Sequence, residues 1–238
     1  MDMEGFFRLH DGLPREGPGC DGDVEWAVAK AGMAGAARVL DAGSGPGGDV
    51  TALRRAMPGA KIVAVDSHTP FIDTLNARFA GDPKVNGVVG DMMVQDGPFD
   101  LIWSAGAIYF IGVTEALTGW RQALAPVGVV AFSQACLFRP DPPEAVNTLF
   151  EGYPITDAAG ISAQVVAAGY KVLASRPVGD TAWETYYQPQ EARIAELWAA
   201  GGIDQALQVA IDEAEQEIAI WRTHRADFGY QLFVVEPA

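Results

Sequence analysis

A glycine-rich turn between an apolar run and a helix-like stretch is the first feature of this 238-residue chain suited to chemistry. Residues 39–48 read VLDAGSGPGG, and glycines let a backbone turn tightly and approach a ligand closely. The next apolar run, residues 62–65, is followed by Asp66, whose carboxylate is placed to accept hydrogen bonds from ribose hydroxyls. Together the turn and the acid predict a site for a nucleotide-like cofactor.

The glycine spacing alone also fits a second interpretation. Gly43, Gly45 and Gly48 satisfy G-x-G-x-x-G, a pattern that places a pyrophosphate at a helix N-terminus. Two acids argue against a pyrophosphate: Asp41 stands just before the turn, where an anion is unwelcome, and Asp91 follows a later strand. An acid beside the turn suits the ammonium of a methionine moiety better. An NAD-dependent oxidoreductase therefore stays as an alternative, supported by the glycine spacing alone.

Residues 41–47 resemble the cofactor motif of class I methyltransferases, which cradles the amino-acid part of S-adenosyl-L-methionine. The resemblance implies that Asp66 binds the ribose, that Asp91 binds the adenine amino group and that Met92 lies against the adenine face. The expected product of the cofactor is S-adenosyl-L-homocysteine. The expected cofactor-binding residues are Asp41, Ala42, Gly43, Gly45, Gly47, Asp66, Ser67, Gly90, Asp91, Met92, Ser104 and Gly106.

A second block, residues 99–109, resembles the fourth strand of these enzymes and the loop beside the transferable methyl group. With residues 6–8, 15–19 and 183–187, it makes the chain similar from end to end to a bacterial subgroup of the family. That likeness implies the cofactor and the reaction but no substrate. The block lacks the Asp/Asn-Pro-Pro-Tyr/Phe signature of DNA-base methylation, and two cysteines are too few to hold a metalloid through thiolates. We therefore expect methyl transfer to an unidentified small molecule.

His10 and Tyr109 are the candidate catalytic residues. His10 lies in an opening segment expected to fold over the cofactor, and an imidazole titrates near neutral pH, which suits a general base. Tyr109 follows the fourth strand, where its hydroxyl would orient the nucleophile, although a packing role fits an aromatic side chain equally. None of the three histidines has a spacing typical of a metal site, so no metal is expected.

Trp183, Tyr186 and Tyr187 form an aromatic cluster that is the candidate substrate-binding group. Aromatic faces suit a substrate pocket or a cationic sulfonium or amine, with core packing as the competing interpretation for two of the three. The expected mechanism is in-line attack on the sulfonium methyl, with positioning and exclusion of water as the protein's main tasks. A non-catalytic protein that binds the cofactor is the other alternative.

Composition restricts the partners. The chain has 31 acidic and 16 basic residues, a formal net charge of −15, so its surface should repel phosphate backbones and anionic lipid headgroups. We expect a small-molecule substrate, neither nucleic acid nor membrane as partner, and a monomer or homodimer. Cys20 and Cys136 lie far apart and outside metal-ligand spacing, and no apolar run approaches a bilayer span, so we expect a cytoplasmic protein.

These residues must be positioned by alternating strands and helices, a pattern typical of parallel strands joined by crossover helices. Strands are expected at 37–41, 61–65, 86–89, 99–103, 127–134, 171–175 and 230–235, and helices at 24–31, 50–57, 69–79 and 114–124. In open α/β sheets ligands bind beyond the carboxyl ends of the strands, so four candidate turns should converge there: residues 43–48, 66–69, 90–93 and 104–109.

The expected fold class is α/β: a three-layer αβα sandwich around a Rossmann-like, mostly parallel, seven-stranded sheet with an antiparallel last strand. Residues 1–238 are expected to form a single domain. Within it we expect an N-terminal lid and helix at 1–35, a cofactor-binding core at 36–136, the rest of the sheet at 137–182 and 229–238, and a helical insertion at 183–228.

Overall fold

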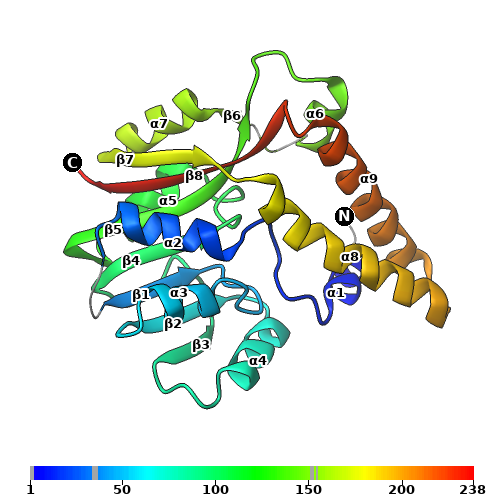
Figure 1. Cartoon of the computed structure of the whole chain (residues 1–238), viewed down its shortest axis with the longest axis horizontal. Coiled ribbons are helices and arrows are strands. Elements are labelled where there is room, and N and C mark those ends of the chain that lie inside the picture. Colours follow the sequence, from blue (N-terminus) through cyan, green and yellow to red (C-terminus); the bar gives the residue numbers. More distant parts are fainter. Residues whose placement is uncertain (1–2, 34–36, 151–152, 154) are drawn as a thin grey trace.

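One sheet lies at the centre of the computed structural model, which describes residues 3–33, 37–150, 153 and 155–238 (Figure 1). Seven strands follow the order β3-β2-β1-β4-β5-β8-β7, and β6 pairs with β5 beside this path. The strands are β1 (Arg38–Ala42), β2 (Lys61–Asp66), β3 (Val85–Val89), β4 (Phe99–Ala105), β5 (Leu124–Leu137), β6 (Thr156–Asp157), β7 (Tyr170–Pro177) and β8 (Phe228–Pro237).

Along the part of the sheet that runs β3-β2-β1-β4-β5, each strand is parallel to the next. β8 is antiparallel to both β5 and β7. The expected mostly parallel path of seven strands with an antiparallel last strand is thereby confirmed. β6 is not among the expected strands, because two residues carry no alternation of apolar and polar side chains. β5 begins at Leu124 rather than at the expected residue 127, because Leu124 already pairs with Phe99 of β4. The register then shifts, and the pairing resumes at Val129 with Leu101.

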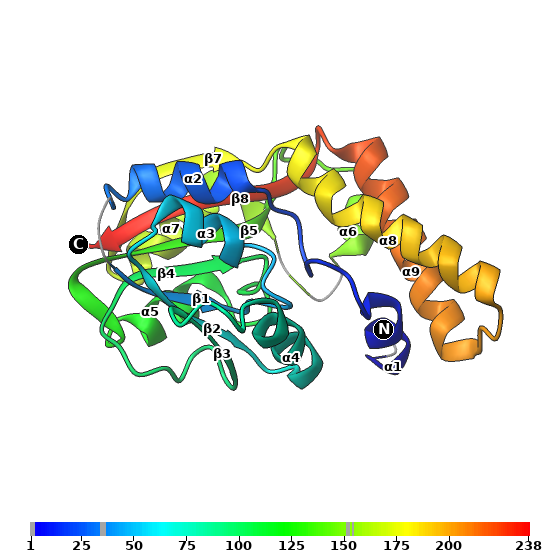
Figure 2. The same cartoon turned by 60° about the horizontal axis from the view of Figure 1, so that its bottom comes forward.

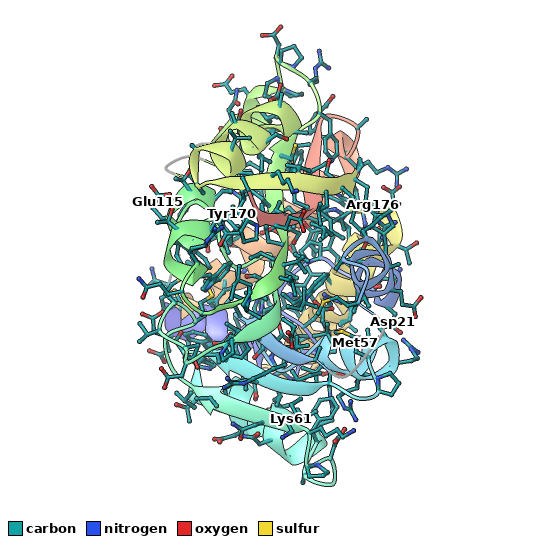
Figure 3. The ribbon with its side chains drawn as sticks, turned by 90° about the vertical axis from the view of Figure 1, so that its left-hand side faces the viewer. Asp21, Met57, Lys61, Glu115, Tyr170 and Arg176 are labelled. Carbon is teal, nitrogen blue, oxygen red and sulfur yellow. The ribbon has the colours of Figure 1, made fainter. Side chains whose placement is uncertain are left out.

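Helices cover both faces of the sheet, which gives three layers. They are α1 (Met3–His10), α2 (Asp21–Lys30), α3 (Val50–Ala56), α4 (Thr69–Arg78), α5 (Val113–Trp120), α6 (Glu144–Leu149), α7 (Ala158–Ala167), α8 (Asp180–Ala200) and α9 (Gln205–His224) within the described residues. The buried apolar side chains form one hydrophobic cluster on each face of the sheet. Val39 of β1 packs in the cluster that includes residues of α2 and α3, and the next residue, Leu40, packs in the cluster that includes residues of α5 and α7. In Figure 3, Asp21 of α2 and Glu115 of α5 lie on opposite sides of the sheet.

α8 and α9 form a hairpin that projects past the sheet on the side to which β7 leads (Figure 1). Both helices begin after a residue with an extended backbone, Gly179 and Asp204, and the Asp204 carboxylate caps α9 by accepting from the Leu207 N–H at 3.0 Å. Within the described residues, no helix combines the length and apolarity needed to cross a membrane.

α1 is a correction to the sequence analysis, which expected only one helix before β1. It packs along α9 so closely that a Cβ atom on Gly5 would lie 2.1 Å from the Ala206 carbonyl oxygen. Leu9 is buried against Ile211, and Figure 2 shows α1 beside the hairpin. An eight-residue helix held mainly by a partner 200 residues later has little local signal. The expected boundary between residues 35 and 36 falls outside the described residues.

Candidate active site

The glycine-rich turn follows β1 and is tied to the end of β2. The backbone N–H groups of Gly43 and Ser44 both donate to the Val65 carbonyl, each at 2.9 Å. Gly43 has a φ of +75°, and a Cβ atom there would lie 2.4 Å from the Ala107 Cβ and 3.2 Å from the Met92 sulfur. The turn therefore requires glycine at this position, and it brings Met92 and Ala107 together beside it.

Asp66, at the end of β2, holds the turn through both of its carboxylate oxygens. Oδ2 accepts from the Gly45 N–H at 2.9 Å, and Oδ1 accepts from the His68 N–H at 2.9 Å. The Asp66 carbonyl also accepts from the Gly90 N–H at 2.9 Å, which brings the third candidate turn to the same edge of the sheet. Each carboxylate oxygen keeps a further lone pair, so Asp66 retains capacity for ribose hydroxyls. Ser67 beside it is exposed.

Asp91 and Met92 occupy the turn after β3 with different surroundings. Asp91 is exposed, and its Oδ1 accepts from the Met93 N–H at 2.8 Å, which is the geometry of a turn aspartate. The Met92 carbonyl accepts from the Trp120 indole N–H at 3.0 Å, so Met92 is anchored from α5. The Met92 side chain thus lies at the glycine turn, while the Asp91 carboxylate is engaged in its own loop.

Asp41 is buried at 2% exposure and one of its carboxylate oxygens, Oδ2, has no hydrogen-bond partner. Burial raises the pKa of Asp41 well above its usual value, the negative charges of Asp49 and Asp66 add to the rise, and Arg15 opposes it. A buried acceptor left without a partner is costly, and a cationic group beside it would relieve the cost. These features fit the ammonium of the expected cofactor.

Arg15 and Asp49 form a buried ion pair that sequence reasoning did not identify. Arg15 Nη2 donates to Asp49 Oδ1 at 3.0 Å, and the Trp103 indole N–H donates to Asp49 Oδ2 at 2.9 Å. Arg15 Nε also donates to the Gly17 carbonyl at 2.5 Å. This network fixes the segment between α1 and α2 against the glycine turn, where a Cβ on Gly48 would lie 2.8 Å from the Arg15 Cβ.

Ser104 and Gly106, at the exit of β4, shape the next turn. Ser104 is fully buried and its hydroxyl donates to the Ala42 carbonyl at 2.8 Å, so only its backbone is left for other contacts. The Gly106 N–H donates to the Ser133 hydroxyl at 2.9 Å. Gly106 has a φ of +65°, and a Cβ there would lie 3.1 Å from the ring of Tyr230. The β4 exit is therefore packed directly beneath Tyr230 of β8.

His10 is buried at 3% exposure and paired with Glu16, whose Oε2 lies 2.5 Å from His10 Nδ1. The Phe6 ring stacks on the imidazole at 4.0 Å between centroids. Glu16 also reaches the glycine turn, since a Cβ on Gly45 would lie 3.0 Å from its Cγ. Burial raises the pKa of Glu16, and its Oε1 has no hydrogen-bond partner. Glu16 therefore links His10, one of the two catalytic candidates, to the glycine-rich turn.

The three aromatic candidates of α8 have different surroundings in the structure. Trp183 is buried in the core, where it stacks on Trp221 at 5.1 Å, which is the packing interpretation. Tyr187 is fully buried and its hydroxyl donates to Glu217 Oε1 at 3.0 Å. Tyr186 is half-buried, 6.4 Å from the His10 ring. Tyr109 lies beside Tyr153 with 36% of its surface exposed, and the partial burial of the side chain raises its pKa to about 12.

Glu217 and Tyr230 also belong to this region but were not among the expected residues. The buried positions of α9 include Ala210 and Trp221, seven residues before and four after Glu217, so Glu217 lies on the apolar face of an amphipathic helix. An acid on such a face was the available signal. No sequence signal could have identified Tyr230, because its position beside Gly106 depends on how β8 inserts into the sheet.

Comparison with known proteins gives a consistent picture. Residues 39–128 match the model of a family described as a methyltransferase domain. The chain is 26% identical over 184 residues to trans-aconitate 2-methyltransferase of Paracidovorax citrulli, which covers 73% of this chain and 71% of that protein. It is 33% identical over 107 residues to malonyl-(acyl-carrier protein) O-methyltransferase of Pseudescherichia vulneris, covering 44% of this chain and 42% of that protein.

Among solved structures, the chain is similar to a SAM-dependent methyltransferase from Thiobacillus denitrificans in complex with S-adenosyl-L-homocysteine. The TM-score is 0.85, the sequence identity is 20%, and the match covers 100% of both chains. At this identity the likeness establishes the fold alone.

Proposed function

We propose that this chain is a class I S-adenosylmethionine-dependent methyltransferase that acts on a small molecule, and that the turns after β1, β2, β3 and β4 bind its cofactor. One observation carries the assignment of residues: Asp41 is buried with an unpartnered carboxylate oxygen beside a turn too tight for a side chain at Gly43. That combination suits the amino-acid end of S-adenosylmethionine. Asp66 then takes the ribose, and Asp91 with Met92 takes the adenine.

S-adenosylmethionine supplies an electrophilic methyl group, so the protein's residues chiefly position the substrate and exclude water. The segment between α1 and α2, fixed by Arg15 and Asp49, forms the cover over the glycine turn. His10 is the proposed general base at Nε2, because Glu16 holds its other ring nitrogen at 2.5 Å. Tyr109, whose pKa is about 12, stays protonated at neutral pH and serves to orient the nucleophile as a hydrogen-bond donor.

The proposal extends to partners and location. A net charge of −15 supports a protein that binds neither nucleic acid nor membranes. We propose a monomer or homodimer located in the cytoplasm, which accords with two thiols, Cys20 and Cys136, that are both free.

Calorimetric titration of the purified protein with S-adenosyl-L-homocysteine and with NAD tests the cofactor assignment. We expect micromolar binding of the first and none of the second. Asp66→Ala should weaken the binding strongly, whereas Asp73→Ala, at an exposed acid on α4, is the matched control. Binding of NAD alone would favour the oxidoreductase, and unchanged affinity in the Asp66 variant would remove the residue assignment. Formation of S-adenosylhomocysteine on a substrate panel distinguishes an enzyme from a non-catalytic binder.

A further inference from the structure

The carboxylate of Glu217 on α9 acts electrostatically on four tyrosines from different parts of the chain and is hydrogen-bonded to one of them. Tyr187 of α8 donates its hydroxyl to Glu217 Oε1 at 3.0 Å, and the ring of Tyr186 lies 5.2 Å from that of Tyr187. Tyr109 follows β4 and Tyr230 lies in β8. The negative charge of Glu217 contributes to a raised pKa at all four tyrosines, so their hydroxyls lie within its electrostatic reach. We call these five residues the Glu217 cluster.

The Glu217 cluster adjoins the proposed cofactor site on two sides. Tyr230 covers the β4 exit, since a Cβ on Gly106 would lie 3.1 Å from its ring. On the other side, Tyr186 lies 6.4 Å from the ring of His10, which is paired with Glu16 at the glycine turn. Tyr109 is exposed, and Tyr186, Tyr230 and Glu217 are only half-buried, so the cluster offers surface to a ligand.

The charge of the cluster is negative, and the basic side chain that acts on Glu217 within the described residues is His10, whose positive charge lowers the pKa of Glu217. In the described part of the chain, Glu217 is hydrogen-bonded to Tyr187 and Glu16 to His10, and neither pairs with Lys or Arg. The arginines of the hairpin are engaged elsewhere: Arg193 pairs with Glu196, and Arg222 pairs with two other glutamates. Burial raises the pKa of Glu217, and the Tyr187 hydroxyl and the charge of His10 oppose the rise without cancelling it, so a further cation would stabilise the anion.

Resting on the proposed function, we propose that the methyl acceptor is a small organic amine, bound as its ammonium ion with Glu217 as the carboxylate partner and the tyrosine rings as a wall. The ammonium gives one proton to His10 Nε2, the proposed general base, and the nitrogen lone pair so freed forms the bond to the methyl group as the bond from that methyl to sulfur breaks. Ammonium groups are attracted to aromatic faces as well as to carboxylates, and both are present here side by side. An anionic substrate would meet Glu16 and Glu217 at close range, and His10, the basic group beside them, is already paired with Glu16. A neutral substrate would leave the Glu217 anion uncompensated.

Three probes of nearly equal size and different charge test this inference. Tetramethylammonium is cationic, tert-butanol is neutral and trimethylacetate is anionic. Each is titrated into the full chain saturated with S-adenosyl-L-homocysteine, at constant ionic strength, with calorimetry and thermal unfolding as readouts. We expect millimolar binding of tetramethylammonium and at least tenfold weaker binding of the other two. Equal binding of the three probes, or preference for trimethylacetate, would overturn the inference.

Two pairs of variants identify the residues. Glu217→Gln should weaken tetramethylammonium binding at least tenfold, whereas Glu215→Gln makes the same change of charge at an exposed position of α9 and should leave it unchanged. Tyr186→Phe should retain binding and Tyr186→Leu should lose it, because the aromatic face is the proposed contact. Unchanged affinity in both Glu217→Gln and Tyr186→Leu would refute the site.

The two proposals fail in different ways. Binding of S-adenosyl-L-homocysteine without any binding of tetramethylammonium would overturn the substrate class and leave the proposed function standing. Absence of S-adenosyl-L-homocysteine binding would overturn the proposed function, and the substrate class with it.

Discussion

Replacing Arg15 by methionine should destabilise the ligand-free protein strongly, because it leaves the Asp49 carboxylate buried without its cation. The two groups are 3.0 Å apart and each side chain is only 9% exposed. Removing one partner of a buried pair costs about 3–5 kcal/mol, since the remaining charge keeps its desolvation penalty. For a chain of this length that corresponds to a fall in Tm of roughly 6–20 °C.

Urea unfolding followed by tryptophan fluorescence measures this cost as a lower midpoint at an unchanged slope. The matched control is Arg55→Met, which breaks an exposed pair with Asp21 and should move the midpoint little. Arg15→Met/Asp49→Asn should recover part of the loss, because the asparagine removes the orphaned charge while still accepting the Trp103 N–H. Equal midpoints for Arg15→Met and Arg55→Met, or no recovery in the double variant, would refute this account of the Arg15–Asp49 pair.

Three further predictions follow from single contacts. Asp41→Asn should stabilise the ligand-free protein at neutral pH and weaken binding of S-adenosyl-L-homocysteine. The pKa of Asp41 is raised in the folded state, so its ionisation destabilises the fold as the pH rises above the unfolded pKa of 3.8. Urea midpoints measured from pH 5 to 8 should therefore fall less in the variant than in the unaltered protein. Gly43→Ala should cost roughly 2–5 kcal/mol through overpacking against Ala107 and a positive φ, and abolish cofactor binding. Gly12→Ala, with positive φ but no neighbour within 4 Å, isolates the strain, and equal unfolding midpoints would contradict the predicted overpacking. Tyr109→Phe should keep affinity for S-adenosyl-L-homocysteine within twofold and lower turnover about tenfold, and full turnover would exclude an orienting role for its hydroxyl.

Those parts of the site that are formed by residues adjacent in the sequence could be predicted from it. β1, the glycine turn and Asp66 carry their signal locally, in apolar runs that end in glycines or acids, and the structure places them at one edge of the sheet. The role of Ser104 could not be predicted, because its hydroxyl partner is the Ala42 carbonyl of another strand. Trp183 could not be separated from Tyr186 by composition, since only the fold decides which aromatic ring enters the core.

The remaining features depend on contacts between distant segments. Arg15 and Asp49 are 34 positions apart, and nothing in either segment indicates that the two side chains meet. Tyr187 and Glu217 are 30 positions apart and meet only because α8 and α9 form a hairpin. α1 is only eight residues long and packs closely against α9, so its position depends on α9.

The place of β8 has a consequence for how the chain is assembled. β8, at residues 228–237, lies between β5 and β7 and is antiparallel to both, so the strand made last fills a gap in the middle of the sheet. Until it arrives, β5 and β7 each present an open edge, and unpaired edges are where chains associate wrongly. α1 likewise waits for α9 before it can dock. During synthesis the docking of α1 therefore waits for residues 205–224, and the completion of the sheet waits for residues 228–237.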